Sequence, residues 1–360
     1  MEILRSRKEK GYGLNLYLVK EQESVKVKAS KIEEYEENGK TLSAPLDVHI
    51  AITNKCNMMC PYCYAKDKDF SAQKDMSLHE LFSVIDKCNE ANVFKLSWSG
   101  GEPLCREELF EVLNYANERG FKQSIITNGT LLDINNIRIL KKLNIAVQIS
   151  LHELNDKKFW EKCSLLVKEK IDTIVDVVMD EKIIGKVQSI VESCRKTGIK
   201  NVKFGPVIPI GMAQNIGHNK TYKEVIKKLI VEIELVRKTT DVKIITQFDN
   251  REYKNSIIPL RTLLCEGATT LIYIDNNGNV YPCPLLKSYP EFFAGNILES
   301  NIFDLWNNAV MEQYRTINSE ETGCAECNQI CGVWCRGLTI AYTGDVKAHS
   351  PFCDCTVRKD

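Results

Sequence analysis

The chain lacks an excess of charge of either sign, because its 48 lysine and arginine residues balance its 48 aspartate and glutamate residues. Proteins that bind nucleic acid through its phosphates usually carry a basic excess, and none is visible here. The sequence also lacks an apolar run long enough to span a bilayer. We therefore expect neither a nucleic-acid partner nor a membrane partner.

The first ten residues are charged and lack the apolar middle of a signal peptide. The expected compartment is therefore the cytoplasm, where disulfides are rare. The chain nevertheless has 15 cysteines. In a reducing compartment, metal or cluster ligation is the natural use for so many thiols. Four that stand singly are expected to be buried free thiols: Cys88, Cys105, Cys163 and Cys194.

The length of 360 residues suggests one large domain and a smaller one. From residue 47 onward, strand and helix patterns alternate. The expected strands are 48–53, 94–98, 123–127, 145–150, 171–179 and 201–207. The expected helices are 78–90, 107–118, 135–143, 156–168 and 187–197. This alternation predicts a parallel sheet with helices outside, and six such units make a partial (β/α)6 TIM-like barrel.

The fold expected is therefore α/β, a partial barrel followed by a small cysteine-rich α+β domain. Three regions follow: an N-terminal hairpin and linker at 1–45, the barrel at 46–250 and the cysteine-rich domain at 251–360. The hairpin pairs residues 14–19 with 25–28, and 221–248 is expected to form a helix and a short strand. In the last region, Asn277 and Gly278 indicate a type I′ hairpin turn, and 302–314 is expected to form one short helix.

Three cysteines stand at Cys-x3-Cys-x2-Cys spacing directly after the first strand of the barrel: Cys56, Cys60 and Cys63. A 4Fe–4S cluster normally takes four thiolates, so three leave one iron with an open position, as in catalytic metal sites. Cys60 and Cys63 alone would more often be half of a zinc site or a redox pair. With the third cysteine and Tyr62, the segment resembles the signature of radical S-adenosylmethionine (SAM) enzymes.

A second motif follows the second expected strand and consists of Gly100, Gly101, Glu102 and Pro103. Two glycines let a ligand approach the backbone, and a carboxylate can pair with a cation. Alone, so short a motif is more often a plain turn. Beside the three-cysteine loop it resembles the second signature of the radical SAM family, in which Glu102 would meet the ammonium group of SAM.

The same resemblance assigns three further residues to the cofactor. Backbone atoms of Tyr62 would meet the adenine amine, and Asn128 and Ser150 would lie near the ribose or the carboxylate. The alternatives are structural: Asn128 as a left-handed turn residue before Gly129, and Ser150 as a strand-end cap.

Seven cysteines of the last region form a second pattern: Cys265, Cys283, Cys324, Cys327, Cys331, Cys335 and Cys353. Zinc is the alternative, because two tetrahedral zincs need eight ligands and Cys355 supplies the eighth. The arrangement resembles the SPASM domain of radical enzymes that modify peptides, which implies two auxiliary iron–sulfur clusters. By that resemblance Cys265, Cys283 and Cys335 hold the first. The remaining four cysteines hold the second.

Three departures from the family pattern stand out. Three residues separate Cys327 from Cys331, where five are usual. No cysteine lies between Cys265 and Cys283, which leaves either an open iron in the first auxiliary cluster or ligation by Cys355. Relatives read Ser-Leu-Asp-Gly after the fourth strand and continue into a helix with an arginine, but this chain has His152 at the aspartate position. His152 is either a proton carrier or a surface histidine.

The resemblance implies an enzyme that cleaves SAM to a radical and modifies a ribosomally made peptide at an unactivated carbon, forming a thioether or carbon–carbon cross-link. A flavodoxin or ferredoxin would supply electrons. The first alternative is an anaerobic sulfatase-maturating enzyme, which forms formylglycine. Such relatives tend to carry aspartate where this chain has Pro284. The second is a non-catalytic zinc or electron-transfer protein. No catalytic acid or base is singled out by spacing.

Overall fold

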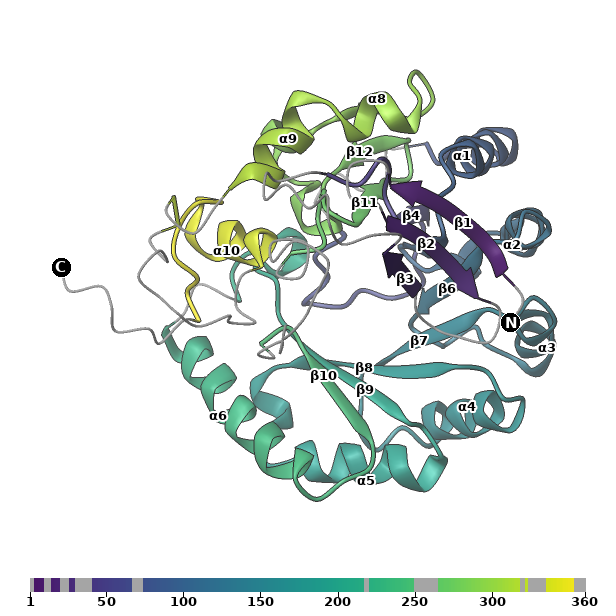
Figure 1. Ribbon diagram of the computed structural model, residues 1–360. Helices are drawn as coiled ribbons and strands as arrows, with labels where there is room; N and C mark the ends of the chain where they lie inside the picture. Colours follow the sequence, from purple (N-terminus) through teal and green to yellow (C-terminus); the bar gives the residue numbers. More distant parts are fainter. Residues whose placement is uncertain are drawn as a thin grey trace.

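The computed structural model describes residues 3–9, 14–19, 26–29, 41–66, 74–216, 220–248, 265–317, 321–322 and 335–352. Its main feature is a ten-stranded sheet in the order β10-β9-β8-β7-β6-β5-β4-β11-β12-β13, and a three-stranded sheet, β1-β2-β3, is separate. The two edge strands of the large sheet, β10 and β13, do not pair, so the barrel is partial as expected. Figure 1 shows the large sheet curving with its helices on the outside.

Seven parallel strands build the barrel: β4 (Asp47–Thr53), β5 (Lys95–Gly100), β6 (Lys122–Thr127), β7 (Ala146–Leu151), β8 (Thr173–Met179), β9 (Asn201–Pro206) and β10 (Lys243–Thr246). The helices between them are α1 (Leu78–Glu90), α2 (Leu109–Glu118), α3 (Ile134–Lys142), α4 (Lys157–Lys168), α5 (Val187–Thr197) and α6 (Lys220–Arg237). Every strand and helix expected in the barrel is present, which confirms the alternation. No helix of the described residues is both long and apolar enough to cross a membrane.

The two faces of the barrel sheet differ in chemistry. On β7, Val147 and Ile149 are at most 1% exposed and face the helices, whereas the residues between them are half-buried. The half-buried face is polar, since Asp47 accepts a hydrogen bond from Lys95 Nζ (2.8 Å) and Gln148 Nε2 donates to Asp176 (2.9 Å). The inside of the barrel is therefore lined with hydrogen-bonding groups together with a few apolar side chains such as Ile126 and Ile174.

The C-terminal region joins the same sheet. Strand β11 (Leu271–Ile274) pairs in parallel with β4, and β12 (Asn279–Tyr281) and β13 (Gly295–Asn296) extend it in antiparallel fashion. A type I′ turn needs positive φ at both central residues, but of Asn277 and Gly278 only Gly278 has it (+86°), so that prediction was wrong. Instead, the Asp275 carboxylate accepts from the backbone N–H groups of Asn277 and Asn279 and shapes a longer turn.

The single helix expected at 302–314 is two helices, α8 (Ile302–Trp306) and α9 (Ala309–Thr316). Each begins at an asparagine, Asn301 or Asn308, whose side chain caps the first turn. The second cap interrupts the expected helix. Helix α10 (Arg336–Thr343) follows. Short 3₁₀ turns complete the structure: η1 (Pro103–Cys105), η2 (Glu181–Ile183), η3 (Gly211–Ala213), η4 (Pro284–Leu286) and η5 (Pro290–Phe292). A domain boundary at residue 250 stays a prediction.

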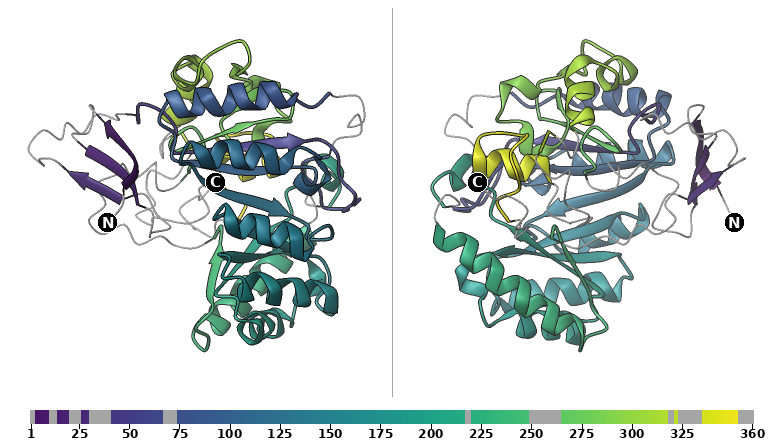
Figure 2. Two further views of the ribbon diagram at one scale, coloured as in Figure 1. Left: turned by 90° about the vertical axis from the view of Figure 1, so that its right-hand side faces the viewer. Right: turned by 60° about the vertical axis from the view of Figure 1, so that its left-hand side comes forward.

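The N-terminal sheet contains the expected hairpin, β2 (Leu14–Val19) with β3 (Lys26–Ala29), and one unexpected strand, β1 (Ile3–Glu9). Arg5 of β1 is 7% exposed and donates to the carbonyls of Val93 (2.7 Å) and Arg119 (2.6 Å). These residues lie just before β5 and β6, so the small sheet sits at the amino ends of the barrel strands. Figure 2 shows it standing apart from the large sheet.

Arg5 is expected to anchor β1. Its guanidinium lies 3.7 Å from the Phe121 ring centroid, and burial lowers its pKa to about 10. Arg5→Ala removes the ring contact and the bonds to two buried carbonyls, worth about 1–3 kcal/mol. Hydrogen exchange of the β1 amides should therefore be roughly 5- to 150-fold faster. Arg195→Ala, which breaks an exposed pair with Glu192, is the matched control. Unchanged β1 protection in Arg5→Ala would contradict the anchoring role.

Candidate functional site

The cysteine loop begins where β4 ends, and Cys56, Cys60 and Cys63 all lie on it. Burial raises the pKa of the Cys60 thiol, and its neighbours Cys63 and Cys56 raise it further. The loop turns back on itself where the Cys63 N–H donates to the Cys60 carbonyl (3.1 Å). The structure thus places the three cysteines that the spacing singled out on one loop, at the carboxyl end of the parallel strands.

The loop offers three thiol sulfurs as ligands. Within the described ranges, no three histidine, cysteine, aspartate or glutamate side chains gather closely enough to hold a metal ion. Thiolates are the soft ligands that select iron–sulfur clusters over oxygen-preferring cations. The donor atoms of the loop therefore suit an iron–sulfur cluster.

The glycines of the second motif contact the cysteine loop rather than leaving open space. The Gly101 N–H donates to the Thr53 carbonyl and the Glu102 N–H to the Lys55 carbonyl, both at 2.8 Å. A Cβ on Gly100 would lie 2.2 Å from the Thr53 carbonyl oxygen, and one on Gly101 would lie 2.2 Å from that of Lys55. The sequence analysis assigned this close approach to a ligand. In the structure it is the backbone leading into Cys56 that comes close.

Glu102 is 1% exposed, and burial raises the pKa of its carboxyl. Its carboxylate accepts from Thr127 Oγ1 (2.7 Å), the Asn128 N–H (2.7 Å) and the Leu104 N–H (3.2 Å). Three of roughly four acceptor positions are thus taken by neutral donors. One position remains for a further donor such as an ammonium group. Pro103 begins η1 directly after it.

Asn128 joins the end of β6 to the cysteine loop. Its Nδ2 donates to Oδ1 of Asn57 (2.9 Å), and Asn57 Nδ2 donates to Thr130 Oγ1 (2.8 Å). Positive φ is found at Gly129 (+73°) and not at Asn128, so the left-handed alternative for Asn128 was wrong. The sequence interpretation missed Asn57, although its place one residue after Cys56 was a signal.

Tyr62 is held by the end of β7. Its hydroxyl shares a 2.6 Å hydrogen bond with Nδ1 of His152, and the two rings stack with their centroids 6.1 Å apart. Burial lowers the pKa of His152, and its Nε2 is buried without a hydrogen-bond partner in the described structure. His152 is therefore not a surface residue. Ser150 lies half-buried two residues earlier, on the polar inner face of β7.

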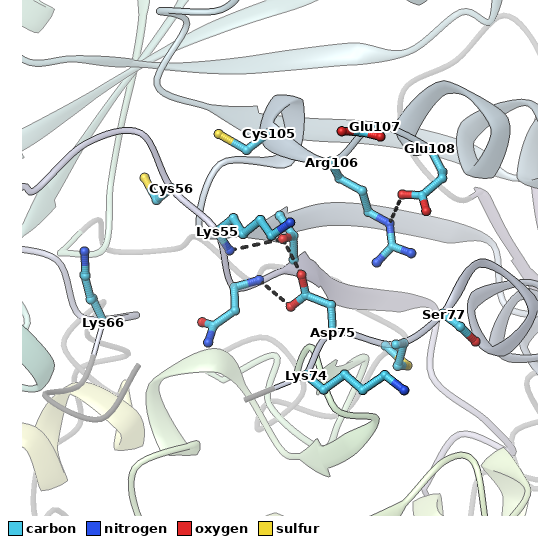
Figure 3. Close-up of a pocket in the computed structure, with 13 residues that line it drawn as sticks. Lys55, Cys56, Lys66, Lys74, Asp75, Ser77, Cys105, Arg106, Glu107 and Glu108 are labelled. Carbon is cyan, nitrogen blue, oxygen red and sulfur yellow. Dashed lines mark hydrogen bonds and ion pairs between the residues drawn. The ribbon is translucent and has the colours of Figure 1, made fainter. Parts of the chain in front are cut away.

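A cavity of about 590 Å³ lies beside Cys56, between the end of β4 and the starts of α1 and α2 (Figure 3). Asp75 crosses its wall, accepting from Thr53 Oγ1 (2.6 Å), the Asn54 N–H (2.7 Å) and Asn276 Nδ2 (3.2 Å). Cys105 also lines the cavity and is half-exposed, so the prediction of a buried thiol was wrong there. The other three single cysteines, in α1, α4 and α5, are buried as expected.

Three cysteines of the C-terminal region also come together. The pKa of the Cys283 thiol is raised by burial and then by Cys335 and Cys265, which lie beside it. A Cβ on Gly337 would lie 3.2 Å from the Cys283 sulfur, so this glycine leaves room at the thiol. The remaining predicted ligands lie outside the described residues: Cys324, Cys327, Cys331 and Cys353, together with Cys355.

Two family models match the chain. The one described as the radical SAM superfamily matches residues 50–215, and the SPASM model, described as an iron–sulfur cluster-binding domain, matches residues 265–328. The first range contains the cysteine loop and β5–β9, and the second begins at Cys265. Both predicted regions are therefore matched by the families that the motifs resemble.

Curated relatives match over most of their length. The chain is 23% identical over 335 residues to "PqqA peptide cyclase" of Granulibacter bethesdensis, covering 87% of this chain and 88% of that protein. It is 21% identical over 341 residues to "AdoMet-dependent heme synthase" of Oleidesulfovibrio alaskensis, covering 86% and 87%.

Solved structures share the fold. Streptococcus suis SuiB bound to S-adenosylmethionine superposes with a TM-score of 0.71 at 17% identity, covering 88% of this chain and 79% of that one. Native anSMEcpe with bound AdoMet gives 0.68 at 20%, covering 86% and 94%. These likenesses confirm the predicted partial barrel with its added domain.

The contact of Gly101 with Lys55 predicts how a methyl group would act. Gly101→Ala should displace the cysteine loop, at a cost of about 1–3 kcal/mol, and lower the iron and sulfide bound per chain after anaerobic reconstitution. Gly205→Ala in β9 is the matched control, because nothing lies within 4 Å of its added Cβ. Equal amounts of bound iron and sulfide in the two variants would show that the contact of Gly101 with Lys55 does not position the loop.

Proposed function

The chain is a radical SAM enzyme with a SPASM domain, and from that premise we propose that it modifies a ribosomally made peptide by hydrogen abstraction from an unactivated carbon, forming a thioether or carbon–carbon cross-link. The observation that carries the proposal is the loop with its three cysteines, which backbone hydrogen bonds hold against Gly101 and Glu102. A relative named as a peptide cyclase, and likeness to SuiB, which has been solved with its precursor peptide SuiA, support a peptide as substrate.

The cofactors are SAM, a 4Fe–4S cluster and auxiliary iron–sulfur clusters. We assign the first cluster to Cys56, Cys60 and Cys63, which leaves one iron without a protein ligand. When bound there, reduced cluster and SAM supply a 5′-deoxyadenosyl radical. The residues of the chain hold the loop still: backbone contacts at Gly101 and Glu102 fix its beginning, and the His152 hydrogen bond fixes Tyr62 near its end.

For SAM itself we assign Glu102 to the ammonium group, through its one remaining acceptor position. Gly100, Gly101 and Pro103 shape the same corner. Tyr62 is assigned to the adenine, and Asn128 and Ser150 to the ribose or carboxylate. These residues lie at or beyond the carboxyl ends of β4, β5, β6 and β7, at the same edge of the sheet, where parallel barrels place their chemistry.

A peptide would reach the site through the barrel opening. The polar inner face offers hydrogen-bond partners such as Gln148 and Asp176 to a backbone. The N-terminal sheet lies at the opposite end of the strands, about 20 Å away for seven residues of β4. If that sheet adds a strand to the peptide, the docked segment and the modified residue must therefore be separated by several residues of peptide.

The auxiliary clusters are assigned to Cys265, Cys283 and Cys335, and to Cys324, Cys327, Cys331 and Cys353. They would accept the electron that remains when a new bond forms and pass it to an external carrier. A flavodoxin or ferredoxin is proposed as the donor that reduces the first cluster. Because the chain belongs to the radical SAM family, the alternative of a non-catalytic zinc or electron-transfer protein is dropped.

Formylglycine formation is the second candidate, because the fold of anSMEcpe, a sulfatase maturase, is similar. Such relatives tend to have an aspartate after the cysteine that corresponds to Cys283. Here the residue is Pro284, which begins η4 and has no group that accepts a proton. The peptide cross-linking proposal is therefore preferred.

Replacing one thiol of the loop tests the cluster assignment. With dithionite and SAM under anaerobic conditions, Cys60→Ala should lower 5′-deoxyadenosine formation to the level without protein, because two thiolates do not hold the cluster. Liquid chromatography with mass detection measures the product. Cys88→Ala, a single thiol buried in α1, should keep the parent rate. Parent-like cleavage by Cys60→Ala contradicts the assignment.

The product of a peptide substrate tests the reaction type. A short peptide encoded beside the gene should lose two hydrogens. Its mass-spectrometric fragmentation should give no backbone fragments between the two cross-linked residues. A cysteine converted to formylglycine would instead lose its sulfur atom, and a hydrazine reagent would trap the resulting aldehyde. A trapped aldehyde would favour the second candidate. SAM cleavage without any change of the peptide would exclude that peptide as substrate.

A further inference from the structure

Tyr314, on α9, lies against the first auxiliary cysteine group. We propose that its hydroxyl donates a hydrogen bond to the sulfur of Cys265 when that sulfur binds iron, and so raises the reduction potential of the first auxiliary cluster. This inference rests on the proposed function, specifically on the assignment of Cys265, Cys283 and Cys335 to that cluster. Tyr314 thereby acts on electron transfer through Cys265 and is not a catalytic residue.

The geometry of the pair supports a hydrogen bond. The hydroxyl oxygen of Tyr314 lies 3.4 Å from the Cys265 sulfur, a normal separation for a bond to sulfur. Tyr314 is 1% exposed and Cys265 is 8% exposed, so water hardly competes for either atom. A sulfur that binds iron carries no proton, and it can then only accept. In the cluster-bound protein, Tyr314 must therefore be the donor.

The packing around the Tyr314 ring holds the hydroxyl in place. Phe292 contacts it edge-on, with ring centroids 5.8 Å apart and an interplanar angle of 87°. A Cβ on Gly267 would lie 3.1 Å from Tyr314 Cε1, so the absence of a side chain there gives the ring its space. The next residue, Arg315, donates to the carbonyls of Ala268 (2.7 Å) and Trp306 (2.8 Å) and fixes α9 to the segment that carries Cys265.

Such a bond changes the ease of reduction. Reduction adds one negative charge to a buried cluster, and a donor aimed at a ligand sulfur stabilises the more negative state. The protein thus tunes the reduction potential through a hydrogen bond to the sulfur. Without the hydroxyl the same cluster should be harder to reduce, while its ligands and its burial stay the same.

The test uses the full chain with Cys56, Cys60 and Cys63 replaced by alanine, so that only auxiliary clusters assemble. After anaerobic reconstitution, a dithionite titration followed by electron paramagnetic resonance gives the midpoint potentials. Tyr314→Phe should lower one of them. At the parent midpoint we expect the reduced-to-oxidised ratio to fall by about tenfold, which is 59 mV for one electron. The second auxiliary potential should not move.

Tyr222→Phe is the matched control. It also removes a buried hydroxyl, which donates to the Met179 carbonyl (2.8 Å) and accepts from the Val207 N–H (2.6 Å), two backbone groups of the barrel rather than a cysteine sulfur. This variant should leave both potentials unchanged. A second measurement avoids deletion altogether: 3-fluorotyrosine makes every phenol a stronger donor, and it should raise the parent potential but not that of Tyr314→Phe.

The outcomes separate the inference from the assignment beneath it. If auxiliary signals appear and neither Tyr314→Phe nor fluorotyrosine moves a potential, the role of Tyr314 is refuted and the ligand assignment stands. If Tyr222→Phe shifts the potential as much as Tyr314→Phe, the effect is structural and the inference also fails. If the parent assembles no auxiliary cluster, the ligand assignment fails, and the inference fails with it.

Discussion

The cysteine loop depends on a backbone contact that only glycine permits. At the end of β5, the N–H groups of Gly101 and Glu102 donate to the Thr53 and Lys55 carbonyls, the last residues before Cys56. The carbonyl oxygen of Lys55 lies only 2.2 Å from where a Cβ of Gly101 would be. Since each strand end is fixed by its place in the parallel sheet, this contact fixes where the thiols start. The glycines are thus needed for the loop first, whatever they do for a cofactor.

Other elements hold the same loop from different sides. Asp75, just before α1, bridges Thr53 and Asn54 to Asn276 in the β11–β12 turn. Lys287, beyond Cys283, donates to the Ala65 carbonyl at the far end of the loop (2.5 Å). Because β11 also pairs with β4, the C-terminal region is part of the scaffold of the loop. Clusters bound at the cysteine loop and in the C-terminal region would therefore keep a fixed separation.

The barrel could be predicted because its strands and helices follow simple periodicities and end at clear caps, such as the capping box of Ser77 and Glu80 at α1. Strand β1 could not, because its inward positions are Arg5 and Arg7, which bind through carbonyls and aromatic faces instead of apolar burial. The asparagine at 308 likewise interrupts an apolar pattern that fits one helix. Each miss comes from a polar residue in a structural role.

The motif cysteines could be predicted from spacing, but the groups that orient them could not. Tyr62 meets His152 across 90 residues of sequence, and Cys265 meets Tyr314 across 49. Only the folded sheet brings such pairs together. His152 is instructive because it stands where the family pattern has an aspartate. Since its Nδ1 is engaged by Tyr62, any contact with a ligand must use Nε2, the buried nitrogen that has no partner in the described structure. The departure from the pattern therefore provides a second polar atom beside Tyr62.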